Sequence, residues 1–181
     1  AMNGIKVPAK APHLISSEHQ ELINLVMGSL RHKMPINVLL SGDSGDGKTS
    51  LTRQVAATYA LPHASIEVAA YEDPKRLFGY GYLEDGKTGF REGLLTHAIR
   101  TPNAVIELRE LNRPRNDEIY NGLLSILDPT VRGIWIDELG EVSVAQGVTF
   151  WATINEGDEY LGTIPLDEAL LRRFQIRLIV K

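Results

Sequence analysis

The chain has 181 residues, of which 43% are hydrophobic, and its formal net charge is -4. This length suits one well-buried α/β domain and is too short for two ordinary domains. The chain contains no cysteine, which excludes disulfides and thiolate chemistry and favours a reducing, cytoplasmic setting. The negative charge gives no general attraction to nucleic acid, and no apolar run approaches the ~20 residues of a membrane span.

The first third of the chain predicts an extended arm followed by a helix, a strand and a second helix. Residues 1–15, with Pro8 and Pro12, indicate the arm. Ser17 and Gln20 fit a capping box at the start of a helix that ends before Met34-Pro35. The apolar run 36–40 predicts a buried strand, residues 50–60 a helix, and residues 64–69 a short strand.

A glycine-rich segment connects the first predicted strand to the second helix. Glycines let such a loop curl so that its backbone N–H groups cradle phosphates, and the following helix adds its positive N-terminal end. Lys48 would reach the β- and γ-phosphates, and the Thr49 hydroxyl would ligate Mg²⁺. The sequence therefore predicts an ATP or ADP site. Its predicted phosphate-binding residues are Gly42, Asp43, Ser44, Gly45, Asp46, Gly47, Lys48, Thr49 and Ser50.

The middle of the chain predicts a hairpin. Residues 77–83 and 88–90 flank the turn Glu84-Asp85-Gly86-Lys87, and a short helix follows over 92–99. Alternating aromatic residues in this hairpin are compatible with stacking on nucleic acid bases. Because basic residues are sparse there, packing within the insert is the favoured interpretation.

The last part of the chain continues the alternation of strands and helices. Strands are predicted over 103–108, 148–154 and 175–180, with helices over 116–127 and 167–172. A second hairpin over 134–144 carries an acidic tip, Asp137 to Glu141. Strands that alternate with helices after a phosphate loop predict an α/β fold with a parallel sheet wrapped on both faces.

An ATPase also needs a group that orients the attacking water and a cation that balances charge in the transition state. Glu110, after the third predicted strand, is placed to orient the water. Asn155, after the fourth, could polarise that water or contact the γ-phosphate. Both residues are therefore candidate catalytic residues.

Together these motifs resemble the AAA+ ATPases, specifically their MoxR-like branch. The resemblance covers nearly the whole chain. It implies a three-layer phosphate-loop fold with a five-stranded parallel sheet in the order 5-1-4-3-2, over residues 16–181, without the C-terminal helical lid of the family. Besides the phosphate loop and Asn155, the resemblance rests on Phe90 to Leu95, Glu110 to Arg113, the hairpin before the fourth strand, and Leu166 to Phe174.

The resemblance also implies roles and an assembly. Asn155 would be the sensor-1 residue, and Arg173 the arginine finger that reaches a neighbouring subunit's nucleotide, with Arg172 as the alternative finger. The other interpretation of this arginine pair is a cap on a helix C-terminus, worth only ~0.3–1 kcal/mol. Such proteins form homo-oligomeric, commonly hexameric rings that remodel or mature a protein partner.

One position departs from the family pattern. Arg109 stands where the family has an aspartate that holds the water shell of Mg²⁺. A unit positive charge ~4 Å from a divalent cation costs about 8 kcal/mol at an effective dielectric constant of 20. Glu107 lies on the same face of the strand and could pair with Arg109. We therefore expect impaired Mg²⁺ affinity and hydrolysis, unless Arg109 turns outward and Thr49 suffices.

Three functions remain open at this point. The first is a MoxR-like ATPase that remodels a protein partner, and the second is a nucleotide-binding structural or regulatory subunit with impaired hydrolysis. The third is a DNA-handling motor, because related branches use the hairpin before sensor 1 on DNA. The acidic residues Asp137, Glu138 and Glu141 on that hairpin would repel phosphates, so it ranks last.

Overall fold

The computed structural model describes residues 5–9, 17–31, 35–42, 48–111, 116–155 and 168–180. The predicted loop residues Asp43 to Gly47 lie outside the described residues, as do the side chains of Thr49 and Ser50. Ser17 is the first residue of the first helix, and the residue that precedes this helix, residue 16, is outside the described ones. The capping box of Ser17 and Gln20 therefore remains a prediction. Among the described residues, no helix combines the length and apolar character needed to cross a bilayer.

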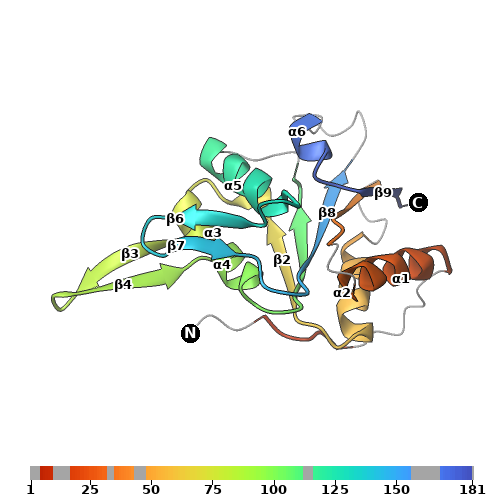
Figure 1. Ribbon diagram of the computed structural model, residues 1–181, viewed down its shortest axis with the longest axis horizontal. Helices are drawn as coiled ribbons and strands as arrows, with labels where there is room; N and C mark the ends of the chain where they lie inside the picture. The colour runs from red at the N-terminus through yellow and green to blue at the C-terminus, as the bar shows by residue number, and fades with distance from the viewer. Residues whose placement is uncertain are drawn as a thin grey trace.

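A five-stranded parallel sheet forms the centre of the molecule (Figure 1). Its strand order is β2-β5-β8-β1-β9, which is the predicted order 5-1-4-3-2 when the sheet strands are counted along the chain. The prediction of an α/β phosphate-loop fold is therefore confirmed. The strands are β1 (Val38–Gly42), β2 (His63–Glu67), β5 (Val105–Arg109), β8 (Thr149–Asn155) and β9 (Ile176–Ile179).

Helices cover both faces of the sheet because successive strand residues point to opposite sides. On β8, Trp151 packs in the apolar cluster shared with α1 and α2, whereas Phe150 and Ala152 pack in the cluster shared with the helices of the other face. Figure 1 shows these two groups of helices on opposite sides of the strands. The helices are α1 (Ser17–Arg31), α2 (Lys48–Thr58), α3 (Pro74–Phe78), α4 (Leu94–Ile99), α5 (Asp117–Leu127) and α6 (Glu168–Leu171), with a 3-10 turn at Val68–Ala70.

Both predicted hairpins are present. The first consists of β3 (Gly79–Glu84) and β4 (Lys87–Glu92) and projects away from the sheet (Figure 1). The second consists of β6 (Gly133–Ile136) and β7 (Gly140–Ser143) and lies beside α5. Part of the N-terminal arm runs along the sheet edge, where the His63 amide donates to the carbonyl of Lys6 at 3.0 Å.

Helix α3 was not predicted. Residues 77 and 78 were assigned to the hairpin, but they form the last turn of this helix. The helix begins because Asp73 accepts a hydrogen bond from the Lys75 amide and Pro74 occupies the first helical position. Gly79 then turns the chain into β3 at a φ of 113°, where an added Cβ would lie 2.5 Å from the Arg91 carbonyl oxygen. The Asp-Pro pair was the available signal.

Candidate nucleotide-binding site

The carboxyl ends of three neighbouring strands bring the predicted site residues together. Gly42 at the end of β1 is in register with Asn155 at the end of β8, and Arg109 at the end of β5 is in register with Thr153. Just beyond β5, the Glu110 amide donates to the Thr153 carbonyl at 2.9 Å. The start of the phosphate loop, Asn155 and Glu110 therefore lie at one edge of the sheet, where α/β proteins bind ligands.

Lys48 lies at the end of the loop and begins α2. Its side chain is buried, and its ammonium group donates to the Gly42 carbonyl oxygen at 2.8 Å. This contact joins the two ends of the phosphate loop. An ammonium group has three donors, so the bond to Gly42 is compatible with bonds to phosphate oxygens.

Glu110 has an uncommon backbone conformation. Its φ is 52°, in the left-handed region. For a residue other than glycine this conformation costs of order 1 kcal/mol and is found preferentially at active sites. The conformation ends the extended run of β5 immediately before Glu110, and it agrees with the predicted catalytic role.

Arg109 lies close to Glu107, the partner that the sequence offered, and also to Glu67, which the sequence analysis did not name. Its Nε lies 3.7 Å from Oε1 of Glu107, and its Nη1 lies 4.0 Å from Oε2 of Glu67, its register partner on β2. Glu107 is fully buried, whereas the Arg109 and Glu67 side chains are 42% and 43% exposed. The positive charge of Arg109 is thus held between two acidic residues beside the nucleotide site.

The buried Glu107 carboxylate also contacts two residues that the sequence interpretation missed. Thr52, on α2, donates its hydroxyl to Oε2 of Glu107 at 2.6 Å, and His63 Nε2 lies 3.2 Å from that hydroxyl oxygen. Because the Thr52 proton goes to Glu107, we assign the His63 proton to Nε2, from which it donates to Thr52. The only sequence signal was that Thr52 follows Thr49 by one helical turn.

His63 remains neutral at physiological pH. Burial, reinforced by the positive charge of Arg53, lowers the pKa of His63 from 6.5 to about 4. The imidazole therefore adds no positive charge to the network of Glu107, Thr52 and His63, and the cation beside the Glu107 carboxylate is Arg109, at 3.7 Å. This network ties the helix that follows the phosphate loop to the strand that carries Arg109.

The two candidate finger arginines have different surroundings. Arg172 pairs with Glu168 on the exposed surface of α6. Arg173 donates to the carbonyls of Leu124 and Ala169 at 3.3 and 3.2 Å, and it lies 3.4 Å from Oδ2 of Asp128. Hydrogen bonds from Thr130, with a smaller contribution from the charge of Arg173, lower the pKa of Asp128. Within one chain, Arg173 therefore occupies the position of a helix cap.

The described residues fit a nucleotide better than they fit Mg²⁺. Lys48 supplies a cation for phosphates, and Glu110 and Asn155 supply polar groups next to it. At the family's metal-ordering position, however, the side chain is a guanidinium that two carboxylates hold in place. A cation cannot order the water shell of a metal ion, so Arg109 does not fit that role.

Comparison with known proteins agrees with the geometry. The chain is 44% identical over 176 residues to the protein named "Putative chaperone BssE" from Thauera aromatica, and the aligned region covers 97% of this chain and 61% of that protein. It is 33% identical over 162 residues to YojN from Bacillus subtilis (strain 168), which covers 86% of this chain and 49% of YojN. The chain thus spans about half to three fifths of the length of these curated relatives.

The family assignment rests on a match to most of the chain. Residues 37–174 match the model of AAA domains of the dynein-related subfamily. This segment begins just before β1 and ends after α6, so it contains the whole candidate site. The chain therefore belongs to the dynein-related subfamily of AAA domains, the MoxR-like group that its motifs resemble.

Proposed function

We propose that this chain binds ATP or ADP at the carboxyl edge of its sheet and, within a ring of subunits, uses the nucleotide state to remodel or mature a protein partner. The observation that carries the proposal is the meeting of Gly42, Lys48, Glu110 and Asn155 at the ends of three adjacent strands. The name of the Thauera aromatica relative, which includes the word chaperone, supports a partner that is a protein.

Each residue has a proposed task. Lys48 would bind phosphate oxygens while its ammonium group keeps the bond to Gly42. Glu110, whose amide donates to the Thr153 carbonyl, would orient the attacking water. Asn155, beside Gly42, would contact the γ-phosphate or the same water.

Arg173 would act on the nucleotide of a neighbouring subunit, with Arg172 as the alternative. For Arg173 this role requires the guanidinium to leave Asp128 and two helix carbonyls. Arg172, whose partner among the described residues is the exposed Glu168, would move at lower cost. Finger activity is therefore proposed for the assembled ring.

A second candidate function is a nucleotide-binding regulatory subunit that hydrolyses ATP slowly or not at all. The specific observation in its favour is Arg109, which is paired with Glu107 and Glu67 and therefore does not turn freely into solvent. Mg²⁺, when bound, would polarise the phosphate oxygens. The described part of the site lacks the usual carboxylate at position 109 to hold its water shell.

The two candidates differ in turnover and in the Mg²⁺ dependence of nucleotide binding. We would measure both in the wild-type chain, in Arg109→Asp, and in the double variant Glu107→Gln/Arg109→Asp. The double variant is needed because a new carboxylate at position 109 would face Glu107 and Glu67 without a cation. A glutamine at position 107 removes one of these charges and still accepts from Thr52. Arg91→Asp, on the projecting hairpin, is the matched charge control.

Impaired hydrolysis predicts nucleotide binding that Mg²⁺ changes little in the wild type, and turnover that rises at least about tenfold in the double variant. If wild-type turnover is fast and the double variant has the same turnover, hydrolysis is not impaired. The first candidate function, an ATPase that remodels or matures a protein partner, would then hold. No nucleotide binding under either condition would overturn both candidates.

A further inference from the structure

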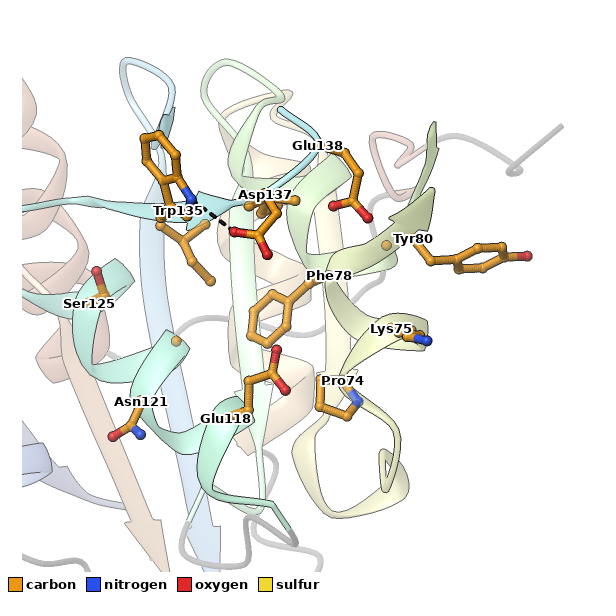
Figure 2. Close-up of a pocket in the computed structure, with 14 residues that line it drawn as sticks. Pro74, Lys75, Phe78, Tyr80, Glu118, Asn121, Ser125, Trp135, Asp137 and Glu138 are labelled. Carbon is orange, nitrogen blue, oxygen red and sulfur yellow. Dashed lines mark hydrogen bonds between the residues drawn. The ribbon is translucent and has the colours of Figure 1, made fainter. Parts of the chain in front are cut away.

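A cavity of about 480 Å³ lies outside the nucleotide site, between α3, α5 and the β6–β7 hairpin (Figure 2). Phe78 and Ile134 pack beneath it against Gly122, where an added Cβ would lie 2.6 Å from the Phe78 ring. Its volume falls in the range of small-ligand sites. None of the residues that line it belongs to the candidate nucleotide site. They are Pro74, Lys75, Phe78, Gly79, Tyr80, Glu118, Asn121, Gly122, Ser125, Ile134, Trp135, Ile136, Asp137 and Glu138.

The lining combines acidic and aromatic side chains. The lining contains three carboxylates, on Glu118, Asp137 and Glu138, and one cation, Lys75, so its formal charge is -2. Figure 2 shows the three carboxylates arranged around the Phe78 ring, with Trp135 beside Asp137. The Trp135 side chain is highly exposed, with 69% of its surface accessible. An exposed tryptophan next to carboxylates is a preferred surface for an organic cation.

Hydrogen bonds hold two of these carboxylates in place. The Trp135 indole N–H donates to Oδ1 of Asp137 at 3.1 Å, which also fixes the orientation of the ring. The Gly81 amide of the other hairpin donates to Oε1 of Glu138 at 3.2 Å. Because each carboxylate has further lone pairs, both can accept from a ligand without losing these bonds. The site is therefore preorganised for a donor.

The spacing of the acids selects the kind of cation. Among the residues that the structure describes, no group of three acidic or histidine side chains is close enough to hold a metal ion. The carboxylates are instead distributed around a cavity with an apolar floor, which suits a long side chain with an apolar stem and a charged end. Arginine and lysine have this form, and arginine adds planar donors that stack on tryptophan.

We propose that this cavity binds an arginine or lysine side chain of a basic segment in a protein partner. The inference rests on the proposed function for its biological setting, because it names the chemistry of the partner that the AAA domain would act on. Its physical basis is separate, since the cavity shares no lining residue with the nucleotide site.

The test uses the peptide acetyl-Gly-Ser-Arg-Ser-Gly-amide and its citrulline analogue, which keeps the shape of arginine and loses the charge. Binding to the ¹⁵N-labelled chain is followed by NMR at the Trp135 indole N–H and at the Gly81 and Gly122 amides. We expect saturable shifts with the arginine peptide, and at least about tenfold weaker binding of the citrulline peptide. Trp151, which is fully buried, provides an internal reference signal.

Two double variants with equal changes in net charge locate the interaction. Asp137→Asn/Glu138→Gln keeps oxygen acceptors for Trp135 and Gly81 and should weaken the arginine peptide at least about tenfold. Glu84→Gln/Asp85→Asn, at the tip of the projecting hairpin, should change it less than about twofold because exposed charges at a distance are screened. The NMR spectrum shows whether each variant is folded. Trp135→Ala, at an exposed position, is a second variant that removes the aromatic ring of the proposed site.

Three outcomes would overturn the proposal: equal binding of the arginine and citrulline peptides, equal losses in the two double variants, or no saturable shift. Tighter binding of spermidine than of the arginine peptide would assign the cavity to a free polyamine and also overturn it. Nucleotide binding, measured with a fluorescent ADP, separates this proposal from the proposed function. A chain that binds the arginine peptide and no nucleotide would contradict only the proposed function, and the reverse result only this proposal.

Discussion

The nucleotide site and the hairpin cavity differ in how their charged side chains are paired. At the end of β5, Glu107 and Glu67 face Arg109, and at the other side of the site Lys48 is held by a backbone carbonyl. The cavity lining contains three carboxylates and one lysine, and two of the carboxylates, on Asp137 and Glu138, accept hydrogen bonds from neutral N–H groups. Internal pairing fixes the geometry of the first region, whereas the second retains an unbalanced charge with which to recognise a partner.

The largest effect is expected for Lys48→Met, which tests whether the first region binds phosphate at all. Charge-assisted hydrogen bonds of a buried ammonium contribute about 1.5–3 kcal/mol, so nucleotide affinity should fall about 100-fold. Fluorescence titration with a labelled ADP measures this loss. Lys87→Met, at the start of β4 in the projecting hairpin, is the control and should leave the affinity unchanged. Equal affinity in Lys48→Met and wild type would remove this region from nucleotide binding.

The second prediction concerns the pH dependence of stability in the buried network. The pKa of His63 is about 4 in the folded chain against 6.5 when exposed, so below pH 6.5 the unfolded chain binds a proton that the folded chain resists. Stability should therefore fall by up to about 3 kcal/mol as the pH is lowered from 6.5 to 4. Urea unfolding at several pH values measures the slope.

His63→Gln removes this titration and keeps a donor for Thr52, so its stability should change less over the same pH range. Other carboxylates titrate in this range in both proteins, and the comparison of slopes cancels them. Parallel slopes in His63→Gln and wild type would show that the pKa of His63 is the same in the folded and unfolded chains, which would contradict an imidazole kept neutral by burial.

The third prediction tests the link between α2 and β5. Thr52→Val removes the hydroxyl that donates to the fully buried Glu107 at 2.6 Å and preserves the shape of the side chain. Loss of a hydrogen bond to a buried charged group should lower the free energy of unfolding by about 2 kcal/mol. Thr58→Val, at an exposed position of the same helix, should change it by less than about 0.5 kcal/mol. If the two variants are equally stable, Glu107 does not depend on Thr52.

The same two regions show how far the sequence could predict the structure. The sheet order was predictable only from the family resemblance. The meeting of Glu110 and Asn155 at one edge, and the closeness of Arg109 to Glu107, were predictable because the carboxyl ends of parallel strands share an edge and alternate strand residues share a face. Thr52 and His63 were missed because they meet Glu107 only through tertiary packing. No periodic pattern marks such a contact between residues far apart in the chain.

The cavity was missed for a related reason. Both hairpins were predicted, and the acidic tip with Asp137 and Glu138 was noted as a feature that repels DNA. In the structure, Gly81 of the other hairpin donates a hydrogen bond to Glu138, and helix α3 lines the same cavity. The local sequence of the acidic tip does not indicate either neighbour. Phe78 was assigned to the predicted hairpin, but it is the last residue of helix α3 and lies in the floor of the cavity. A hairpin can thus be predicted locally, but the surface between two hairpins cannot.

The smallest effect on stability distinguishes the two candidate finger arginines. Arg172→Ala should change the free energy of unfolding by less than about 0.5 kcal/mol, because its pair with Glu168 is exposed. Arg173→Ala should lower it by about 1 kcal/mol, because it loses Asp128 and two helix carbonyls. Thermal unfolding of the two variants measures this difference.

The turnover of the same two variants in the assembled ring tests whether the internally paired arginine or the exposed one is the finger. A finger contributes about 10³ or more to the turnover of the assembled ring, far beyond what either stability change explains. If turnover falls by that factor in Arg173→Ala and not in Arg172→Ala, the internally paired arginine is the finger, and ring assembly must break its pair with Asp128. If it falls only in Arg172→Ala, Arg173 is a cap. Internal pairing would then mark residues that hold the site together, and charges with weak partners would mark residues that act on other molecules.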